Sequence, residues 1–352
     1  MELRRGAVAF CSATALILSV TLAAQAPRKL TKAEEKERDA ISKIVASVSA
    51  GQPAPDDLGV KWVREDVMKA SDNQQYLPFI VTVDPSKAQA KNLVVYWRVV
   101  SNAPPAGGKA SPDNKASPDN KNKGAVPQFA YESIGNATVN PTDGTLARIS
   151  RSFVALPGSY DVYVVVKEPS LEKPPKNAPA PKMSVIKKTV EVPDLWNGEL
   201  NTSTVLIGRI DPLPAPLTPQ QAADRPYAAL GTMEITPDLD TKFTKKGELS
   251  TFMLIYNAKV DSANKPDIIV EYNFYAKQAG GEKFFNKTNP QNLNGQTLPP
   301  QFDFAAGHQL QAGQAVPLAS FPEGEYRLEI KVTDKLANKT LTRDVNFSVA
   351  GS

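Results

Sequence analysis

Two stretches of the chain repeat each other and decide the fold: LPGSYDVYVVVKE at residues 156–168 and FPEGEYRLEIKVTD at residues 321–334. Each has a proline-containing turn, a glycine, a tyrosine two residues after the glycine, and then apolar residues at every second position. A period of two is the period of a β-strand that buries one face. Each copy is therefore predicted to be a turn that leads into a half-buried strand.

The repeat extends to the neighbouring segments in the same order. LVVYWRVV at 93–100 corresponds to IIVEYNFYAK at 268–277, and SVIKKTVEVP at 184–193 corresponds to TLTRDVNFSV at 340–349. Short strands at this spacing, together with 30 prolines against 20 glycines, favour a loop-rich β protein. We therefore predict an all-β chain with two tandem immunoglobulin-like antiparallel β-sandwiches.

The tyrosines of the repeat, Tyr160 and Tyr326, stand at the start of equivalent strands. In immunoglobulin-like domains a tyrosine at such a corner bonds through its hydroxyl to the backbone while its ring enters the core. We predict this structural role for both. Trp97 lies in an apolar strand and is predicted to belong to the core of the first sandwich.

The rest of the chain is divided by composition. Thr31 and Glu34 have the spacing of a capping box, and apolar residues at helical spacing follow, so residues 32–49 are predicted to form one amphipathic helix. Between Ser101 and Pro127 the unit KASPDN occurs twice without any apolar residue larger than alanine, which predicts a disordered loop. The predicted parts are a signal peptide at 1–26, a helix and linker at 27–57, a sandwich at 58–195, a linker with one strand (204–210) and a proline-rich tether at 196–226, and a second sandwich at 227–352.

The first 26 residues have the pattern of a secretory signal. Arg4 and Arg5 precede a short apolar run, and small residues follow it. Since Pro27 would hinder cleavage after Ala26, we expect cleavage near Ala23–Ala24 and an exported chain, periplasmic or extracellular. The alternative is a segment retained as an anchor; otherwise the mature chain has no predicted membrane span.

The second half resembles a known group of proteins. VEVPDLWNGELNTSTVLIG, then RPYAALGTMEITPDLDTKFTKKGELSTFMLIYNA, then FPEGEYRLEIKVTDKLANKTLTRDVNFSV is similar to the tandem β-sandwich region of exported proteins from Acidobacteria and related bacteria. Some of these carry a GWxTD-type or von Willebrand factor A-like domain, and neither is evident in this chain. The resemblance covers the second half well and the first sandwich less closely. It implies localisation and fold, and it carries no functional residue.

The residue content argues against most catalytic chemistry. The only cysteine, Cys11, lies in the signal segment, and the only histidine is His308. A serine–histidine–acid site or a zinc site would need partners that the sequence does not show. We therefore expect no enzyme, no catalytic residue, no metal site and no cofactor. The net charge of +4 comes from interleaved basic and acidic residues, which does not favour a nucleic-acid partner.

Four aromatic residues are candidates for a contact surface: Trp196, Tyr227, Phe284 and Phe285. The first two flank the junction of the sandwiches, and the Phe pair lies in a hairpin or loop. The sequence favours a binding or assembly protein that presents sandwich loops or edge strands to a protein partner. The alternative is a carbohydrate-binding or envelope-associated protein with a polysaccharide ligand, which exposed coplanar aromatics on one sheet face would indicate. An enzyme is the third hypothesis.

Overall fold

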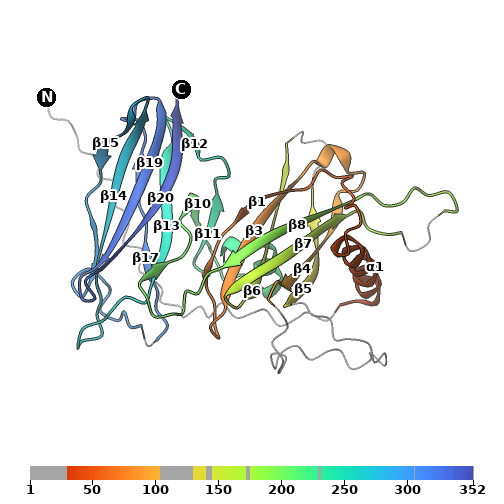
Figure 1. Ribbon diagram of the computed structural model, residues 1–352, viewed down its shortest axis with the longest axis horizontal. Helices are drawn as coiled ribbons and strands as arrows, with labels where there is room; N and C mark the ends of the chain where they lie inside the picture. The colour runs from red at the N-terminus through yellow and green to blue at the C-terminus, as the bar shows by residue number, and fades with distance from the viewer. Residues whose placement is uncertain are drawn as a thin grey trace. The chain divides into compact units, whose positions relative to one another are not determined.

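The computed structural model describes residues 30–103, 130–139, 145–171, 175–228, 231–304 and 306–351 (Figure 1). The chain forms two compact units. Of the described residues, the N-terminal module comprises those from Leu30 to Leu195 and also Pro219–Pro226, and the C-terminal module comprises Trp196–Thr218 and those from Tyr227 onward. The predicted signal peptide and nearly all of the predicted disordered loop, residues 104–127, lie outside the described residues.

The N-terminal module is a sandwich of two antiparallel sheets. One sheet has the order β5-β4-β7-β8, and in the other β3 pairs with β6 and with the short strands β1 and β2. The strands are β1 (Lys61–Glu65), β2 (Met68–Lys69), β3 (Gln75–Val83), β4 (Asn92–Ser101), β5 (Tyr131–Thr138), β6 (Ala147–Ala155), β7 (Gly158–Lys167) and β8 (Met183–Val192), with a 3-10 turn η1 (Pro85–Lys87). Alternate side chains of both sheets fill the core, among them Trp97, Phe79 and Phe153.

Helix α1 (Lys32–Ser49) covers the outer face of the β5-β4-β7-β8 sheet. It begins with the predicted capping box, in which Thr31 Oγ1 accepts from Glu34 N and Glu34 Oε2 accepts from Thr31 N. Its side chains Ile41 and Val45 are fully buried against the sheet. Within the described residues, no helix is both long and apolar enough to cross a bilayer.

The C-terminal module repeats the arrangement. One sheet has the order β12-β20-β19-β14-β15 with β16 also on β14, and the other has β11-β10-β13-β17 with β9 and β18 on β13. The strands are β9 (Asn201–Thr202), β10 (Leu206–Pro212), β11 (Met233–Pro237), β12 (Lys242–Thr244), β13 (Glu248–Tyr256), β14 (Asp267–Gln278), β15 (Gly281–Lys287), β16 (Gln291–Asn294), β17 (Leu310–Ala312), β18 (Ala315–Pro317), β19 (Gly324–Asp334) and β20 (Lys339–Ala350). The pair β12–β20 is parallel, and the other strand pairs are antiparallel.

The core of this module is rich in aromatic rings. Phe274, Phe321, Tyr326 and Phe347 are all buried and contact one another at ring-centroid distances of 5.2–6.2 Å. The edge-to-face arrangement of Phe274 on Phe321 is one of the favourable geometries for aromatic pairs. The all-β prediction is thus confirmed in both modules.

The tyrosine corner is present in both copies. Tyr160 Oη donates to the carbonyl of Leu156 at 3.0 Å, and Tyr326 Oη donates to the carbonyl of Pro322 at 2.7 Å. The glycine two residues earlier, Gly158 or Gly324, has φ near +150° in each copy, a conformation that favours a residue without a Cβ. The structural role predicted for the two tyrosines is confirmed.

The segment between the two predicted sandwiches forms regular structure where the sequence predicted a proline-rich tether. Its first part forms β9 and β10, which belong to the C-terminal module. Its later part forms a short helix α2 (Pro219–Asp224) and a 3-10 turn η2 (Pro226–Ala228), and Pro219–Pro226 belongs to the N-terminal module. Tyr76 Oη donates to the carbonyl of Pro226 at 3.1 Å, and Arg151 pairs with Asp224 at 3.3 Å. These contacts give residues of the linker a fixed place on a sandwich, which composition alone did not indicate.

Candidate interaction surface

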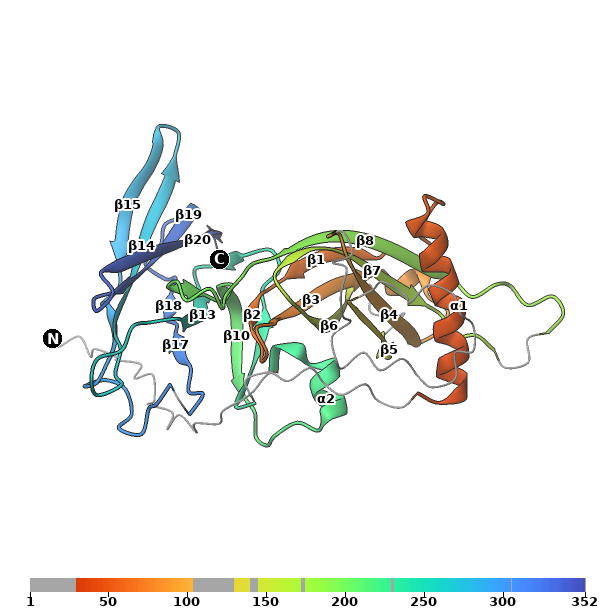
Figure 2. The same ribbon diagram turned by 60° about the horizontal axis from the view of Figure 1, so that its bottom comes forward.

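The β14–β15 hairpin provides an edge strand. β15 pairs with β14 and stands at the end of its sheet. The hairpin continues past the last β14–β19 pair, Ala276↔Tyr326, and closes between Gln278 and Gly281 (Figure 2). An edge strand presents backbone N–H and C=O groups that a further strand can pair with.

The two phenylalanines of β15 have opposite surroundings. Phe284 is 51% exposed and lies edge-on to Tyr275, its partner across the strands, with ring centroids 5.8 Å apart. Phe285 packs on the core residues Phe321 and Tyr326 at 4.9 and 5.5 Å. A bulge at this point of β15 shifts the register. Phe285 therefore stabilises the module, and Phe284 is the one available to a partner.

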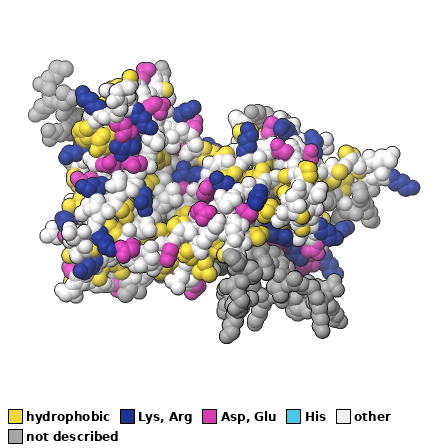
Figure 3. All heavy atoms as spheres, in the orientation of Figure 1, with side chains coloured by type: hydrophobic (Ala, Val, Ile, Leu, Met, Phe, Trp, Pro, Cys, Tyr) yellow, Lys and Arg dark blue, Asp and Glu magenta, His cyan; other side chains and the backbone are white. Residues whose placement is uncertain are grey.

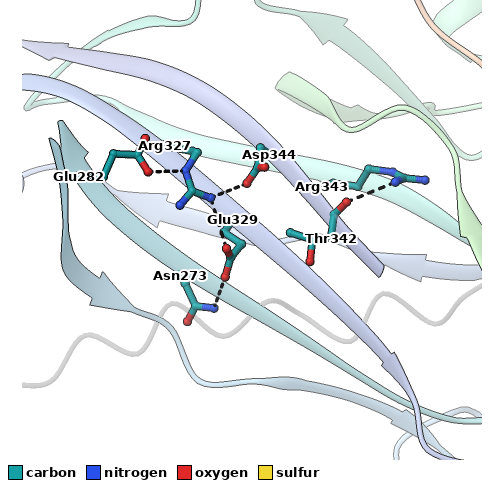
Figure 4. A network of polar contacts seen from close by, with 7 residues as sticks. All are labelled: Asn273, Glu282, Arg327, Glu329, Thr342, Arg343 and Asp344. Carbon is teal, nitrogen blue, oxygen red and sulfur yellow. Dashed lines mark hydrogen bonds and ion pairs between the residues drawn. The ribbon is translucent and has the colours of Figure 1, made fainter. Parts of the chain in front are cut away.

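Arg327 of β19 completes the exposed cluster. Its guanidinium carbon lies 4.5 Å from the centre of the Tyr275 ring, a cation–π distance. It also pairs with Glu282 at 2.8 Å, Glu329 at 3.3 Å and Asp344 at 2.6 Å (Figure 4). The hydrogen bond to Glu282, with those to the other two carboxylates, raises the pKa of Arg327 above its usual value. The guanidinium is consequently a fixed charge that three carboxylates hold over the Tyr275 ring.

We name Phe284, Tyr275 and Arg327, with Glu282, the Phe284 patch. Figure 3 shows hydrophobic, basic and acidic side chains side by side at the upper left of the view, where Figure 1 places β14, β15 and β19. Exposed aromatic residues beside an arginine are typical of the residues that contribute most to protein–protein binding. In the described part of the chain, no group of three or more histidine, cysteine or acidic residues could hold a metal ion.

The other predicted contact residues are placed differently. Trp196 is 40% exposed at the start of the C-terminal module, whereas Tyr227 is only 5% exposed. At this exposure little of the Tyr227 side chain is open to solvent, and its assignment to a contact surface stays a prediction. Phe285 is partly buried and packs on Phe321, so it contributes to the core, and its assignment to a contact surface also stays a prediction. His308 has a structural role, since its Nδ1 accepts a hydrogen bond from the backbone of Asp303 at 2.9 Å.

Sequence reasoning missed Tyr275 and Arg327. The signal for Tyr275 was the hairpin itself, because counting outward from the two-residue turn at 279–280 pairs Tyr275 with Phe284. To find Arg327 from the sequence, one would need to know that β14 pairs with β19, because this pairing places Arg327 directly opposite Tyr275. The repeat marks β19 as a strand, but it does not say which strand lies beside it.

Comparison with known proteins gives no family for this chain. No protein-family model matches it, and no curated protein matches it.

The solved structures that it matches are distant. They include an Escherichia coli alpha-2-macroglobulin activated by porcine elastase, with 11% identity, a TM-score of 0.23, and coverage of 86% of this chain and 22% of the other. A Salmonella alpha-2-macroglobulin mutant gives 10% identity, a TM-score of 0.19 and coverage of 84% and 17%. A protein designated pT26-6p gives 10% identity, a TM-score of 0.19 and coverage of 95% and 72%. This chain spans about a fifth of the alpha-2-macroglobulin chains, and likenesses at these scores carry no argument about its function.

Proposed function

We propose that this protein is an exported, non-enzymatic binding or assembly protein that contacts a protein partner through the Phe284 patch. The observation that carries the proposal is the half-exposed Phe284 on an edge strand, beside Tyr275 and the fixed charge of Arg327. A buried apolar anchor next to an arginine is the usual centre of a protein–protein interface.

The charges on β15 argue for a partner other than a second copy of the same strand. Lys283 and Lys287 flank the Phe pair, and a bulge interrupts the strand. Lysines and bulges are the features by which edge strands avoid pairing with copies of themselves. A partner with acidic side chains near Lys283 and Lys287 would meet opposite charges and could place an apolar side chain on Phe284.

Export belongs to the same proposal. It is supported by the signal-like pattern of residues 1–26 and by the resemblance of the second half to exported tandem-sandwich proteins of Acidobacteria. The proposal of a non-enzymatic role is supported by His308, the single histidine, because its Nδ1 already accepts a hydrogen bond from the backbone of Asp303.

A polysaccharide ligand is the alternative, and the ring geometry of the patch does not favour it. The planes of Tyr275 and Phe284 meet at 80°, so the two rings do not form the flat platform on which a sugar chain stacks. The stacked pairs Trp62–Phe79, Trp97–Tyr131 and Tyr326–Phe347 each contain at least one ring that is buried in a core.

The test compares Phe284→Ala with Leu146→Ala as baits in cross-linking co-purification from the native host. Leu146 is exposed to a similar degree, 56%, and lies outside the patch, so the pair separates a specific anchor from general surface apolarity. We expect one protein to be captured by the unchanged chain and by Leu146→Ala and to be lost with Phe284→Ala, while the circular dichroism of all three is the same. Equal capture by both variants would overturn the proposal. Retention on envelope polysaccharide that depends on Phe284 would establish the alternative.

A further inference from the structure

The outer face of the β5-β4-β7-β8 sheet is an apolar surface under α1. The buried side chains that meet there come from four strands and from the helix, as Figures 1 and 2 show for the elements. They are Ile41 and Val45 of α1 with Val94, Tyr96, Ile134, Tyr163, Val165 and Val185 of the sheet. Leu30, Ile44 and Val48 pack at the margin of this cluster.

The same face of the C-terminal module is polar. The repeat aligns Tyr163 and Val165 of β7 with Glu329 and Lys331 of β19. On β19 these outward positions form ion pairs, for example Lys331 with Glu271 at 3.6 Å, and no helix of the described chain covers them. A sandwich of this type therefore does not need an apolar outer face for its own stability. The apolar outer face of the N-terminal module is the face that α1 covers.

Polar contacts fix the position of α1 on that face. Lys167, which is buried, pairs with Glu37 of the helix and donates to Ser170 Oγ at 2.8 Å. Further along the helix, Arg98 Nη2 donates to Ser42 Oγ at 2.6 Å and pairs with Glu132 at 2.7 Å. These contacts give the face a defined register for a helix with an acid and a serine five residues apart.

The connection from α1 to the sandwich is short and exposed, and the backbone N–H groups of residues 50–52 bond only to carbonyls of α1 itself. Residues 50–54 are exposed, and Gly51 has φ of +94°. The chain is held again only from Pro55, whose carbonyl accepts from Val185 N at 2.8 Å, and at Asp57, whose N–H donates to the carbonyl of Met183 at 2.9 Å. The helix can therefore leave the sheet without breaking a strand pair, because local opening needs only the loss of its own contacts.

We propose that the outer face of the β5-β4-β7-β8 sheet is a helix-docking site that α1 of the same chain fills and that α1 of a second copy can fill instead. A second copy supplies a helix with the same side chains, so its fit to the face is the fit already seen, and only the path of residues 50–54 differs. Exchange of a terminal element between identical chains is a low-cost route to a dimer.

The test uses the full chain and a fluorescent synthetic peptide of residues 30–51, followed by fluorescence anisotropy. Saturable binding is expected, since the peptide competes with the resident helix for one face. The same peptide with Ile41→Asp and Val45→Asp should bind at least ten-fold more weakly, because both fully buried contacts are lost. Absence of saturable binding, or equal binding of the two peptides, would overturn the proposal.

A second test changes the resident helix instead of the peptide, by introducing Glu37→Gln into the full chain. This change weakens the resident helix at Lys167 and leaves the sheet unchanged, so the unchanged peptide should bind it several-fold more tightly than it binds the unmodified chain. A matched control is Glu35→Gln, on the exposed side of the same helix, which should leave the peptide affinity as it was. Amide exchange provides an independent readout: amides of α1 should exchange faster than those of β4, and equal protection would contradict the proposal.

Discussion

At the scale of single residues, the tyrosine corners show how one side chain ties a turn to a sheet. Tyr160 and Tyr326 make the same hydroxyl-to-carbonyl bond to the residue four positions earlier. Replacing either with Phe keeps the ring in the core and removes one hydrogen bond, which leaves a carbonyl without that donor. We expect a loss of about 1 kcal/mol of unfolding free energy for each variant, by urea denaturation. Tyr275→Phe is the control and should change the stability little; a loss as large as that of Tyr326→Phe would show that the corner bond is not the cause.

A second pair of equivalent residues emerges only from the structure. Glu168 and Asp334 end the two repeated stretches and are both buried. Glu168 accepts from the backbone N–H groups of Gln89, Ala90 and Lys182, and Asp334 accepts from those of residues 259, 336 and 337. Each carboxylate thereby binds the loop before the central strand to the end of the repeated strand.

Removing the charge of these carboxylates should destabilise each module. Glu168→Gln and Asp334→Asn turn part of each acceptor set into a donor that faces backbone N–H groups. We expect a loss of about 2 kcal/mol or more for each, because buried hydrogen bonds to a charged group are among the stronger ones. Glu325→Gln, which is exposed on the same strand as Asp334, serves as the control for thermal unfolding. A shift for Glu325→Gln that equals the shift for Asp334→Asn would refute this role.

The sequence could place these acids but could not assign their function. The repeat aligns Glu168 with Asp334, yet their partners are N–H groups of loops such as residues 89–90, and a period of two carries no information on loop geometry. Tyr160 and Tyr326 were easier, because the glycine two residues before each one identifies the corner by itself. The low exposure of Tyr227 could not be predicted, because chain position beside a junction does not determine burial.

At the scale of elements, β4 and β14 show the limits of the hydrophobic pattern. Both are central strands of equivalent sheets, yet β4 is apolar at nearly every position and β14 alternates. The alternation of β14 predicts one solvated face, which the structure has. The continuous run of β4 predicts a strand buried on both faces, but it does not say that α1 provides the second layer. That assignment needed the contacts of Ile41 and Val45.

The short helix α2 is held by a buried arginine, and this contact can be tested. Arg151 is 4% exposed, and its guanidinium lies 5.8 Å from the Trp97 ring centre, donates to the Asn136 carbonyl at 2.7 Å and pairs with Asp224 at 3.3 Å. Burial lowers the pKa of Arg151, and Asp224 opposes that effect. Because Asp224 is partly exposed, Asp224→Asn should cost at most about 1 kcal/mol of unfolding free energy.

Arg151→Ala should cost more, about 3 kcal/mol, because it leaves the Asn136 carbonyl without its donor and removes the packing on Trp97. Urea unfolding monitored by tryptophan fluorescence gives both values. An Asp224→Asn variant that is less stable than Arg151→Ala would mean that the ion pair, and not the buried contacts of the arginine, holds this region.

At the scale of the whole molecule, two sandwiches with separate cores were predictable because the repeat spans three strands in each half. The boundary was not. Residues 201–212 form β9 and β10 of the C-terminal module, whereas the sequence predicted a single strand here, at 204–210, and assigned it to a linker. Both strands belong to the C-terminal module because they pair with β13. Local composition does not predict which distant strands pair with each other.

Both modules should unfold in alkaline solution, and in both the cause should be the ionisation of buried tyrosines. Burial raises the pKa of six of the ten tyrosines, namely Tyr76, Tyr96, Tyr131, Tyr160, Tyr272 and Tyr326. A tyrosine whose folded pKa exceeds its unfolded value of about 10 stabilises the fold fully below that pH, and its contribution falls as the pH rises above it, since the unfolded chain loses the proton first. We therefore expect phenolate absorbance at 295 nm to rise in two stages, the second coinciding with the loss of β-sheet circular dichroism. A single stage near pH 10 that is complete before any loss of the β signal would show that these phenols are not shielded by the two cores.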